Sequence, residues 1–208
     1  MVDPAPAPRS TARVLPAAPV RAFLTVLVFT VALYVIELAD QLSGEFLEAQ
    51  GIVPRELDGL DGVLWAPLLH DDWGHLVANT LPFLVLGFLV MANGFAQFLA
   101  VTATIWVLGG IGVWLTGGAN TVHIGASLVI FGWLTFLLFR GFFARSGRQI
   151  LVAAVLFFFW GGLLLGVLPG QPGISWQAHL FGALAGVLAA RTVAVADRRR
   201  GPAAIRSV

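Results

Sequence analysis

Six long apolar segments alternate with shorter polar ones along most of the chain. A helix needs about 20 apolar residues to cross the hydrocarbon core of a bilayer, and the second and fourth segments are near the short limit. Because backbone groups in lipid must be satisfied within their own segment, such uniformly apolar spans form helices. The pattern therefore predicts an all-α polytopic membrane protein with six transmembrane helices, at 21–42, 75–92, 95–116, 126–143, 149–168 and 177–196.

The composition agrees with this class. Of the 208 residues, 58% are hydrophobic and 11% charged, whereas about a quarter of the residues in soluble domains are charged. There is no cysteine, which excludes disulfides, a thiol nucleophile and a thiolate metal site.

The two ends of the chain differ from the membrane domain at 21–196. Residues 1–20 are rich in proline and alanine, which predicts a disordered tail. The apolar run that follows continues into Glu37 and Asp40, so we expect an uncleaved first span rather than a signal peptide. Residues 197–208 form a second, basic tail.

Arginine placement predicts the orientation. All twelve basic residues are arginine, and only Arg55 falls in a loop on the side opposite the termini. By the positive-inside rule, both termini are cytoplasmic. The basic tail then anchors beside anionic lipid, and a nucleic-acid partner is not expected. A compact six-span chain without an organelle-targeting leader points to a multi-pass protein of a bacterial plasma (inner) membrane.

The first outer loop, about 43–74, is long and amphipathic. It carries seven of the eleven acidic residues, but also leucines spaced like one face of a helix, and two tryptophans. This predicts a partly helical element in the outer interface. A small cap packed on the bundle is the alternative.

Three reactive side chains open spans that run in the same direction. His75 opens the second span, Ser127 the fourth and His179 the sixth, each within about 10 Å of the outer end of its helix. Polar groups inside a span usually face a partner or a cavity, so a shared depth predicts one site. Taken singly, each also fits plain helix packing, and His75 with Asn79, one turn on, also fits interhelical hydrogen bonding.

The residue types fit acyl transfer. A serine hydroxyl is a weak nucleophile that needs a neighbouring base, and neutral His179 can accept the proton of Ser127. No acid lies near His179 in the sequence, so we expect a dyad without a third carboxylate. Candidate donors to the oxyanion are the Ser127 backbone N–H, His75 and Asn79. Gly182 and Gly186 form a GxxxG on the last span, which favours close approach of helices.

These pieces resemble the rhomboid family of intramembrane serine proteases in its six-span bacterial form. The matching motifs are HDDWGHLVAN at 70–79, Gly125-Ala126-Ser127, and Ala178-His179 with Gly182 and Gly186. The resemblance implies a six-transmembrane-helix rhomboid-like bundle with a long, partly helical first outer loop. It implies a serine endopeptidase that needs no cofactor or metal.

The resemblance also implies roles for single residues. Ser127 is the nucleophile, His179 the base, and His75 and Asn79 help to form the oxyanion hole. Gly125 supports the site, and Phe131 stands where an aromatic stacks on the histidine. The implied substrates are membrane-anchored proteins, cut near the outer end of their span. No pattern predicts an oligomeric state.

Departures from the family pattern leave a second hypothesis. Leu128 follows the serine where many members have glycine, and Trp65 lacks the adjacent arginine of some members. A bulky residue at 128 could alter the oxyanion hole or narrow the first substrate pocket, as in a pseudoprotease that binds membrane proteins.

Two further classes are disfavoured. A metal site would use His70, His75, His123 and His179, with Asp71 or Asp72, but the spacing is poor and HExxH is absent. We expect His123 to lie in an outer loop in contact with water. A transporter would show paired broken helices in matching halves, which this chain lacks.

Overall fold

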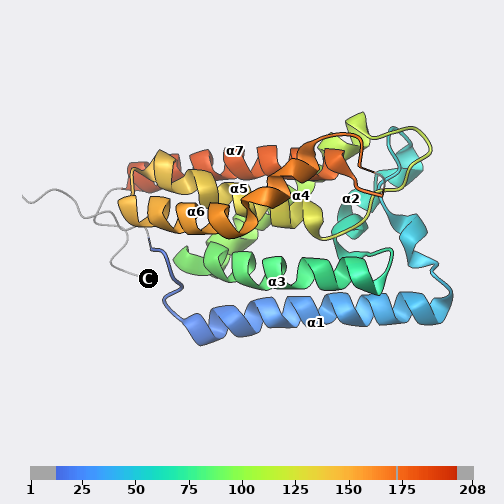
Figure 1. Ribbon diagram of the computed structural model, residues 1–208, viewed down its shortest axis with the longest axis horizontal. Helices are drawn as coiled ribbons and strands as arrows, with labels where there is room; N and C mark the ends of the chain where they lie inside the picture. The colour runs from blue at the N-terminus through green and yellow to red at the C-terminus, as the bar shows by residue number, and fades with distance from the viewer. Residues whose placement is uncertain (1–12, 172, 201–208) are drawn as a thin grey trace, which may run out of the picture.

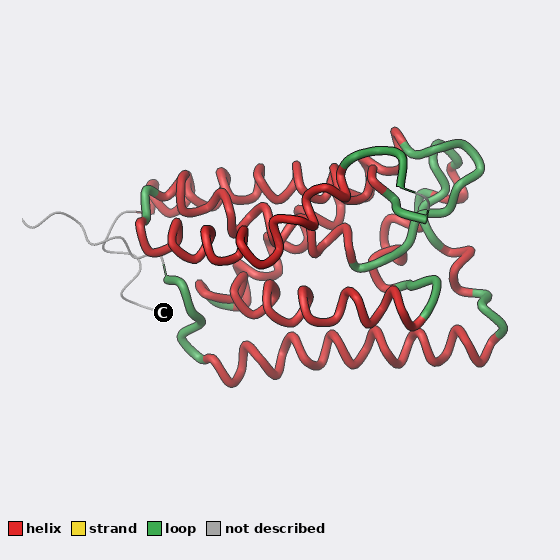
Figure 2. The backbone as a smooth tube through the Cα atoms, viewed as in Figure 1, coloured by secondary structure: helices red, strands yellow, loops and turns green. Residues whose placement is uncertain are grey.

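The computed structural model, which describes residues 13–171 and 173–200, is a bundle of long helices (Figure 1). Figure 2 shows helices joined by loops, without strands, across the described ranges. Within those ranges, six helical segments are long and apolar enough to cross a membrane. The predicted all-α, six-span fold is therefore confirmed. The elements in order are α1 (Pro19–Ser43), η1 (Leu47–Gln50), η2 (Leu57–Gly59), α2 (Gly62–Trp65), η3 (Ala66–Leu68), α3 (Trp73–Val90), η4 (Met91–Asn93), α4 (Phe95–Thr116), α5 (Ser127–Ala144), α6 (Gly147–Trp160), η5 (Gly161–Val167) and α7 (Trp176–Arg200).

Helix α5 is the centre of the bundle. It packs against α7, α6, α3 and α4, whereas α1 packs chiefly against α3 at the edge of the molecule (Figure 1). Trp133 of α5 is 1% exposed, and its indole N–H donates to Thr102 Oγ1 of α4 at 3.0 Å. The rings of Phe83 and Phe98 pack on the same indole. The first residue of this central helix is Ser127, so the core of the bundle fixes its position.

Several helix ends differ from the sequence prediction. Helix α3 begins at Trp73 because the Asp72 side chain caps it, accepting the His75 backbone N–H at 2.7 Å. Helix α6 ends at Trp160 and continues as the 3-10 helix η5. Helix α7 extends to Arg200, four residues beyond the predicted span.

The predicted tails lie partly outside the described residues, namely at 1–12 and 201–208. The described end of the N-terminal segment contacts α6, where the Gln149 amide donates to the Arg13 carbonyl at 3.1 Å.

The segment between α1 and α3 is partly helical, as expected, but forms four short turns instead of one amphipathic helix. It is docked on α4: the Trp106 indole donates to the Val63 carbonyl at 2.7 Å, and Arg55 donates to the Gly117 carbonyl at 2.7 Å. Leu57 and Leu64 remain exposed. The segment therefore combines a packed cap with an exposed apolar surface.

Candidate active site

The structure brings Ser127 and His179 into hydrogen-bond contact. Ser127 opens α5 and His179 lies in the first turn of α7, and the distance from Ser127 Oγ to His179 Nε2 is 3.0 Å. Ser127 is 8% exposed, so the contact is largely shielded from solvent. This is the geometry that a base needs to accept a proton from a hydroxyl nucleophile.

A backbone carbonyl fixes the tautomer of His179. Its Nδ1 lies 3.0 Å from the carbonyl oxygen of Gly166 in η5. A carbonyl only accepts hydrogen bonds, so Nδ1 carries the proton and donates it. In the neutral ring, Nε2 is then free to accept from Ser127. Gly166 thus fills the orienting role that a carboxylate has in a triad.

The ring of Phe131 stacks on the ring of His179. The centroids of Phe131 and His179 are 3.9 Å apart, and their planes differ by 10°. A Cβ at position 166 would lie 2.8 Å from His179 Nδ1 and 3.1 Å from Phe131 Cζ. Glycine is therefore required at 166 for η5 to approach the stacked pair.

Glycines set the separation of α5 and α7. A Cβ at Gly182 would collide with the Leu128 carbonyl oxygen, and one at Gly186 with the Gly132 carbonyl oxygen. Thr135 reinforces this approach, because its hydroxyl donates to the Ala183 carbonyl at 2.8 Å. The GxxxG of α7 therefore lies directly against α5, next to the turn that carries Ser127.

The turn before Ser127 is held by the segment that follows α2. Gly125 has φ +119°, in a region that L side chains rarely adopt, and its N–H donates to the Ala66 carbonyl at 2.8 Å. The Ala126 N–H donates to His70 Nε2 at 3.4 Å. A Cβ at 125 would also collide with the His75 ring. Gly125 thereby allows His75 and Ser127 to face the same space.

His75 and Asn79 lie one turn apart on α3. His75 Nδ1 is 2.5 Å from an Asp71 carboxylate oxygen. Asn79 is 8% exposed, and its Nδ2 has no hydrogen-bond partner among the described residues. A buried amide donor without an acceptor is costly in a folded protein, and a catalytic role is one explanation for it. The Asn79 amide fits a donor that is satisfied only when an oxyanion is present.

His70 is buried behind this site. It is 1% exposed, and its ring packs edge-on against His75. Burial, aided by the charge of His75, lowers the pKa of His70 from 6.5 to about 4. The neutral ring can accept from Ala126 at Nε2, so its protonation would remove support from the turn before Ser127.

Acidification is expected to destabilise the protein through His70. Because its pKa is lower in the folded state, the unfolded chain binds the extra proton first, and stability is lost as pH falls from 6.5 towards 4. The slope is up to about 1.4 kcal/mol per pH unit for one proton. Thermal unfolding in detergent, compared with His70→Asn, measures this effect. Equal pH slopes in the two proteins would contradict it.

The expectation that His123 contacts water is wrong. His123 lies in a loop, as predicted, but is 7% exposed. Its Nδ1 contacts Ser175 Oγ at 2.6 Å, and its Nε2 contacts Thr121 Oγ1 at 2.9 Å. Burial lowers its pKa. An antiparallel β-bridge between His123 and Ile52 explains the burial, because it holds this loop against the segment between α1 and α3. Among the described residues, no group of three His, Asp or Glu side chains is arranged to hold a metal ion.

Leu128 packs in the interior of the bundle. Its side chain is 2% exposed and lies against Gly109 of α4, where a Cβ would come within 2.9 Å of Leu128 Cδ2. This contact places the Leu128 side chain between α5 and α4. The missing side chain at Gly109 provides the room that Leu128 occupies.

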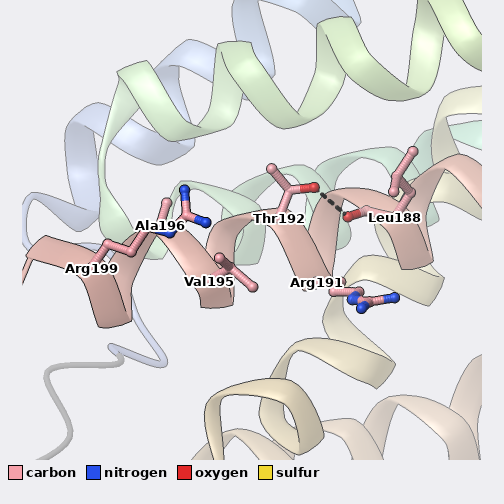
Figure 3. Close-up of a pocket in the computed structure, with 6 residues that line it drawn as sticks. All are labelled: Leu188, Arg191, Thr192, Val195, Ala196 and Arg199. Atoms are coloured by element: carbon pink, nitrogen blue, oxygen red, sulfur yellow. Dashed lines mark hydrogen bonds between the residues drawn. The ribbon is translucent and has the colours of Figure 1, made fainter.

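A separate groove of about 480 Å³ lies on α7 (Figure 3). It begins nine residues after His179, about 13 Å further along the helix axis. The groove and the dyad are therefore distinct. Its lining comes entirely from α7: Leu188, Arg191, Thr192, Val195, Ala196 and Arg199.

Sequence reasoning missed two groups of this site. The Gly166 carbonyl carries no side-chain signal, so no motif search could have found it. Asp71 was visible, because it precedes His75 by four residues, the spacing at which side chains meet on a helix face.

Several known proteins and one family model are similar to this chain. Uncharacterized proteins of Mycobacterium tuberculosis and Mycobacterium bovis are each 52% identical over 183 residues, covering 84% of this chain and 76% of theirs. A Bacillus subtilis protein named "Putative rhomboid protease" is 33% identical over 126 residues, covering 58% of this chain and 61% of its own. A family model described as the Rhomboid domain matches residues 60–195. The chain, with its six apolar helices and its paired Ser127 and His179, belongs to the rhomboid family.

Proposed function

We propose that the protein is an intramembrane serine endopeptidase that acts through a Ser127–His179 dyad. The observation that carries this proposal is the 3.0 Å contact from Ser127 Oγ to His179 Nε2, with Nδ1 of the same ring bound to a carbonyl. The substrates are membrane-anchored proteins, cut near the outer end of their transmembrane span. We place the enzyme in a bacterial plasma membrane with both termini in the cytoplasm.

Each step uses groups of this chain. Ser127 Oγ attacks the scissile carbonyl carbon while His179 Nε2 takes the hydroxyl proton. The resulting oxyanion accepts hydrogen bonds from His75, from the Asn79 amide and from the Ser127 N–H, which has no intrahelical acceptor at the start of α5. Collapse breaks the C–N bond, and His179 protonates the leaving amine. Water then hydrolyses the acyl-enzyme, with His179 again as the base.

Family membership also includes pseudoproteases, and a pseudoprotease that binds membrane proteins is the alternative to the proposed activity. Leu128 was the residue that suggested it, and its side chain packs against Gly109 in the interior. Both members of the proposed dyad are present and in contact.

Wild-type protein purified in detergent is expected to react with a fluorophosphonate probe, because an activated serine displaces fluoride from phosphorus. Mass spectrometry of the labelled peptide should locate the adduct on Ser127. Ser127→Ala is the matched control and should remain unlabelled. A folded wild type that fails to react would shift the assignment to a pseudoprotease that binds membrane proteins.

A further inference from the structure

We propose that the groove on α7 is a docking site for one anionic phospholipid. The headgroup phosphate lies between Arg191 and Arg199, and an acyl chain follows the apolar side chains of α7 that precede these arginines. This site lies outside the dyad, and its ligand is independent of the proposed function.

The groove joins two cationic side chains to an apolar surface. Val195 and Ala196 lie between Arg191 and Arg199 along the helix, and Leu188 comes almost one turn before the first arginine (Figure 3). The volume of about 480 Å³ is in the range of sites that hold small organic molecules. A ligand that matches both parts of the groove carries an anionic group and a hydrocarbon chain, which is the structure of an anionic phospholipid.

An exposed apolar stripe continues from the groove towards the start of α7. Leu184 is 54% exposed and Leu188 is 49% exposed, and they lie one turn apart on the same helix face. Helix α7 is one of the six helices that are long and apolar enough to cross a membrane. The hydrocarbon chains of lipids therefore cover this stripe, and the stripe leads directly to the two arginines.

The two arginines of the groove have no anionic partner among the described residues. Arg191 and Arg199 are exposed, and neither takes part in an ion pair there. The acidic residue of α7, Asp197, lies instead 3.9 Å from the guanidinium of Arg140. A guanidinium keeps its charge at every physiological pH, so the counter-ion of these two arginines comes from outside the described residues.

Arg140 shows how the protein accommodates an arginine that faces the bundle interior. It is 3% exposed, and its guanidinium lies near Asp197 and donates to Gln97 Oε1 at 3.4 Å. Arg191 lies within the last predicted span but faces outwards, where a charged side chain is costly unless it meets a partner. A phosphate at the bilayer surface is the anion present at that face, and arginine–phosphate hydrogen bonds are charge-assisted and strong.

The apolar part of the groove distinguishes a lipid from other anions. Inorganic phosphate would use the arginines alone and gain nothing from Leu188 and Val195. An acidic protein segment would have to enter the hydrocarbon layer to cover Leu184, with its backbone groups unsatisfied there. A phospholipid satisfies both parts at once, because its phosphate stays at the membrane surface while its acyl chain stays in the layer that contains the stripe.

The test is binding of phosphatidylglycerol to the full-length protein in detergent micelles, measured by native mass spectrometry beside phosphatidylcholine at the same concentration. Arg191→Gln combined with Arg199→Gln removes both charges of the groove. Arg148→Gln combined with Arg198→Gln is the matched control, because it removes the same charge from exposed residues of α6 and α7 that do not line the groove. Arg198 instead donates to the carbonyl of Phe143.

Wild type is expected to bind one phosphatidylglycerol about 10- to 30-fold more strongly than phosphatidylcholine, because two arginines contact its charge. The Arg191 and Arg199 double variant should lose this preference, and the control double variant should keep it. Equal binding of both lipids by wild type would overturn the inference. An equal loss of preference in the control would also overturn it, because the effect would then be one of net charge.

A second pair of variants tests the apolar part of the groove. Leu188→Ala should weaken phosphatidylglycerol binding by about 2- to 5-fold, since the acyl chain loses apolar contact. Leu151→Ala, which shortens an exposed leucine of α6, should leave binding unchanged. Equal effects of the two substitutions would contradict an acyl chain in the groove.

The same experiment separates a lipid from other occupants. Inorganic phosphate in excess should not displace phosphatidylglycerol, and displacement would assign the arginines to a soluble anion. A wild-type dimer that dissociates when Arg191 and Arg199 are substituted would assign the groove to a second copy of the chain. Either result would overturn the inference. Because the measurement is binding, such a failure would leave the proposed catalytic function unaffected.

Discussion

Ser127→Ala and His179→Ala are each expected to lower the rate of substrate cleavage by at least about 10⁴-fold, because neither group of the dyad can act without the other. The structure gives the reason: Ser127 Oγ has its base at 3.0 Å, and that base is held in one tautomer by Gly166. The measurement is cleavage of a transmembrane fusion protein by enzyme reconstituted in liposomes. The double variant should be no slower than either single one, since the two residues act as a unit.

The chain supplies a matched control for this experiment. Ser175 and His123 form a second serine–histidine contact, at 2.6 Å, which lies in the loops outside the dyad. Ser175→Ala should keep most of the cleavage rate and leave fluorophosphonate labelling at Ser127 intact. Loss of cleavage in Ser175→Ala, together with retention in Ser127→Ala, would refute the assigned nucleophile.

Leu128→Ala is expected to destabilise the protein by about 2–5 kcal/mol without raising activity, because it leaves a cavity in the packed interior. The Leu128 side chain is 2% exposed and packs against Gly109 of α4. Substitution by glycine, which restores the commoner family pattern, should be at least as harmful, since glycine also weakens the first turn of α5. Thermal unfolding in detergent, alongside the labelling rate, measures both consequences.

Leu184→Ala provides the comparison, because Leu184 of α7 is 54% exposed and its removal opens no interior cavity. It should change stability far less than Leu128→Ala. A Leu128→Gly protein that remains stable and labels faster than wild type would show instead that Leu128 obstructs the site.

The spans could be predicted from the sequence because apolar length alone determines them. Most of their ends lie within two or three residues of the predicted ones. Apolar length does not encode the details that local structure decides, such as the change to η5 after Trp160 and the continuation of α7 to Arg200. The leucine spacing in the first loop suggested one helical face, but Pro67 and the glycines at 59 and 62 divide that segment into short turns.

The serine and histidine could be found because each is a reactive side chain at the start of an apolar span. Their partners were harder to find, for different reasons. The Gly166 acceptor is a backbone group, and the role of Gly109 depends on which helix Leu128 faces. His123 has the same residue type as the others but is enclosed by loop contacts that no local pattern encodes.

The carbonyl of Gly166 has a consequence for the electrostatics of the proposed dyad. Soluble triads orient their histidine with an anion, and an anion placed among apolar helices would have to give up its hydration, at a penalty of several kcal/mol. A peptide dipole selects the same tautomer while adding no net charge. It is also invisible to side-chain mutagenesis, because every residue has a carbonyl. Substitutions of the residue itself test only the steric requirement for glycine at position 166. That steric requirement keeps the carbonyl in contact with His179, so it preserves an electrostatic interaction.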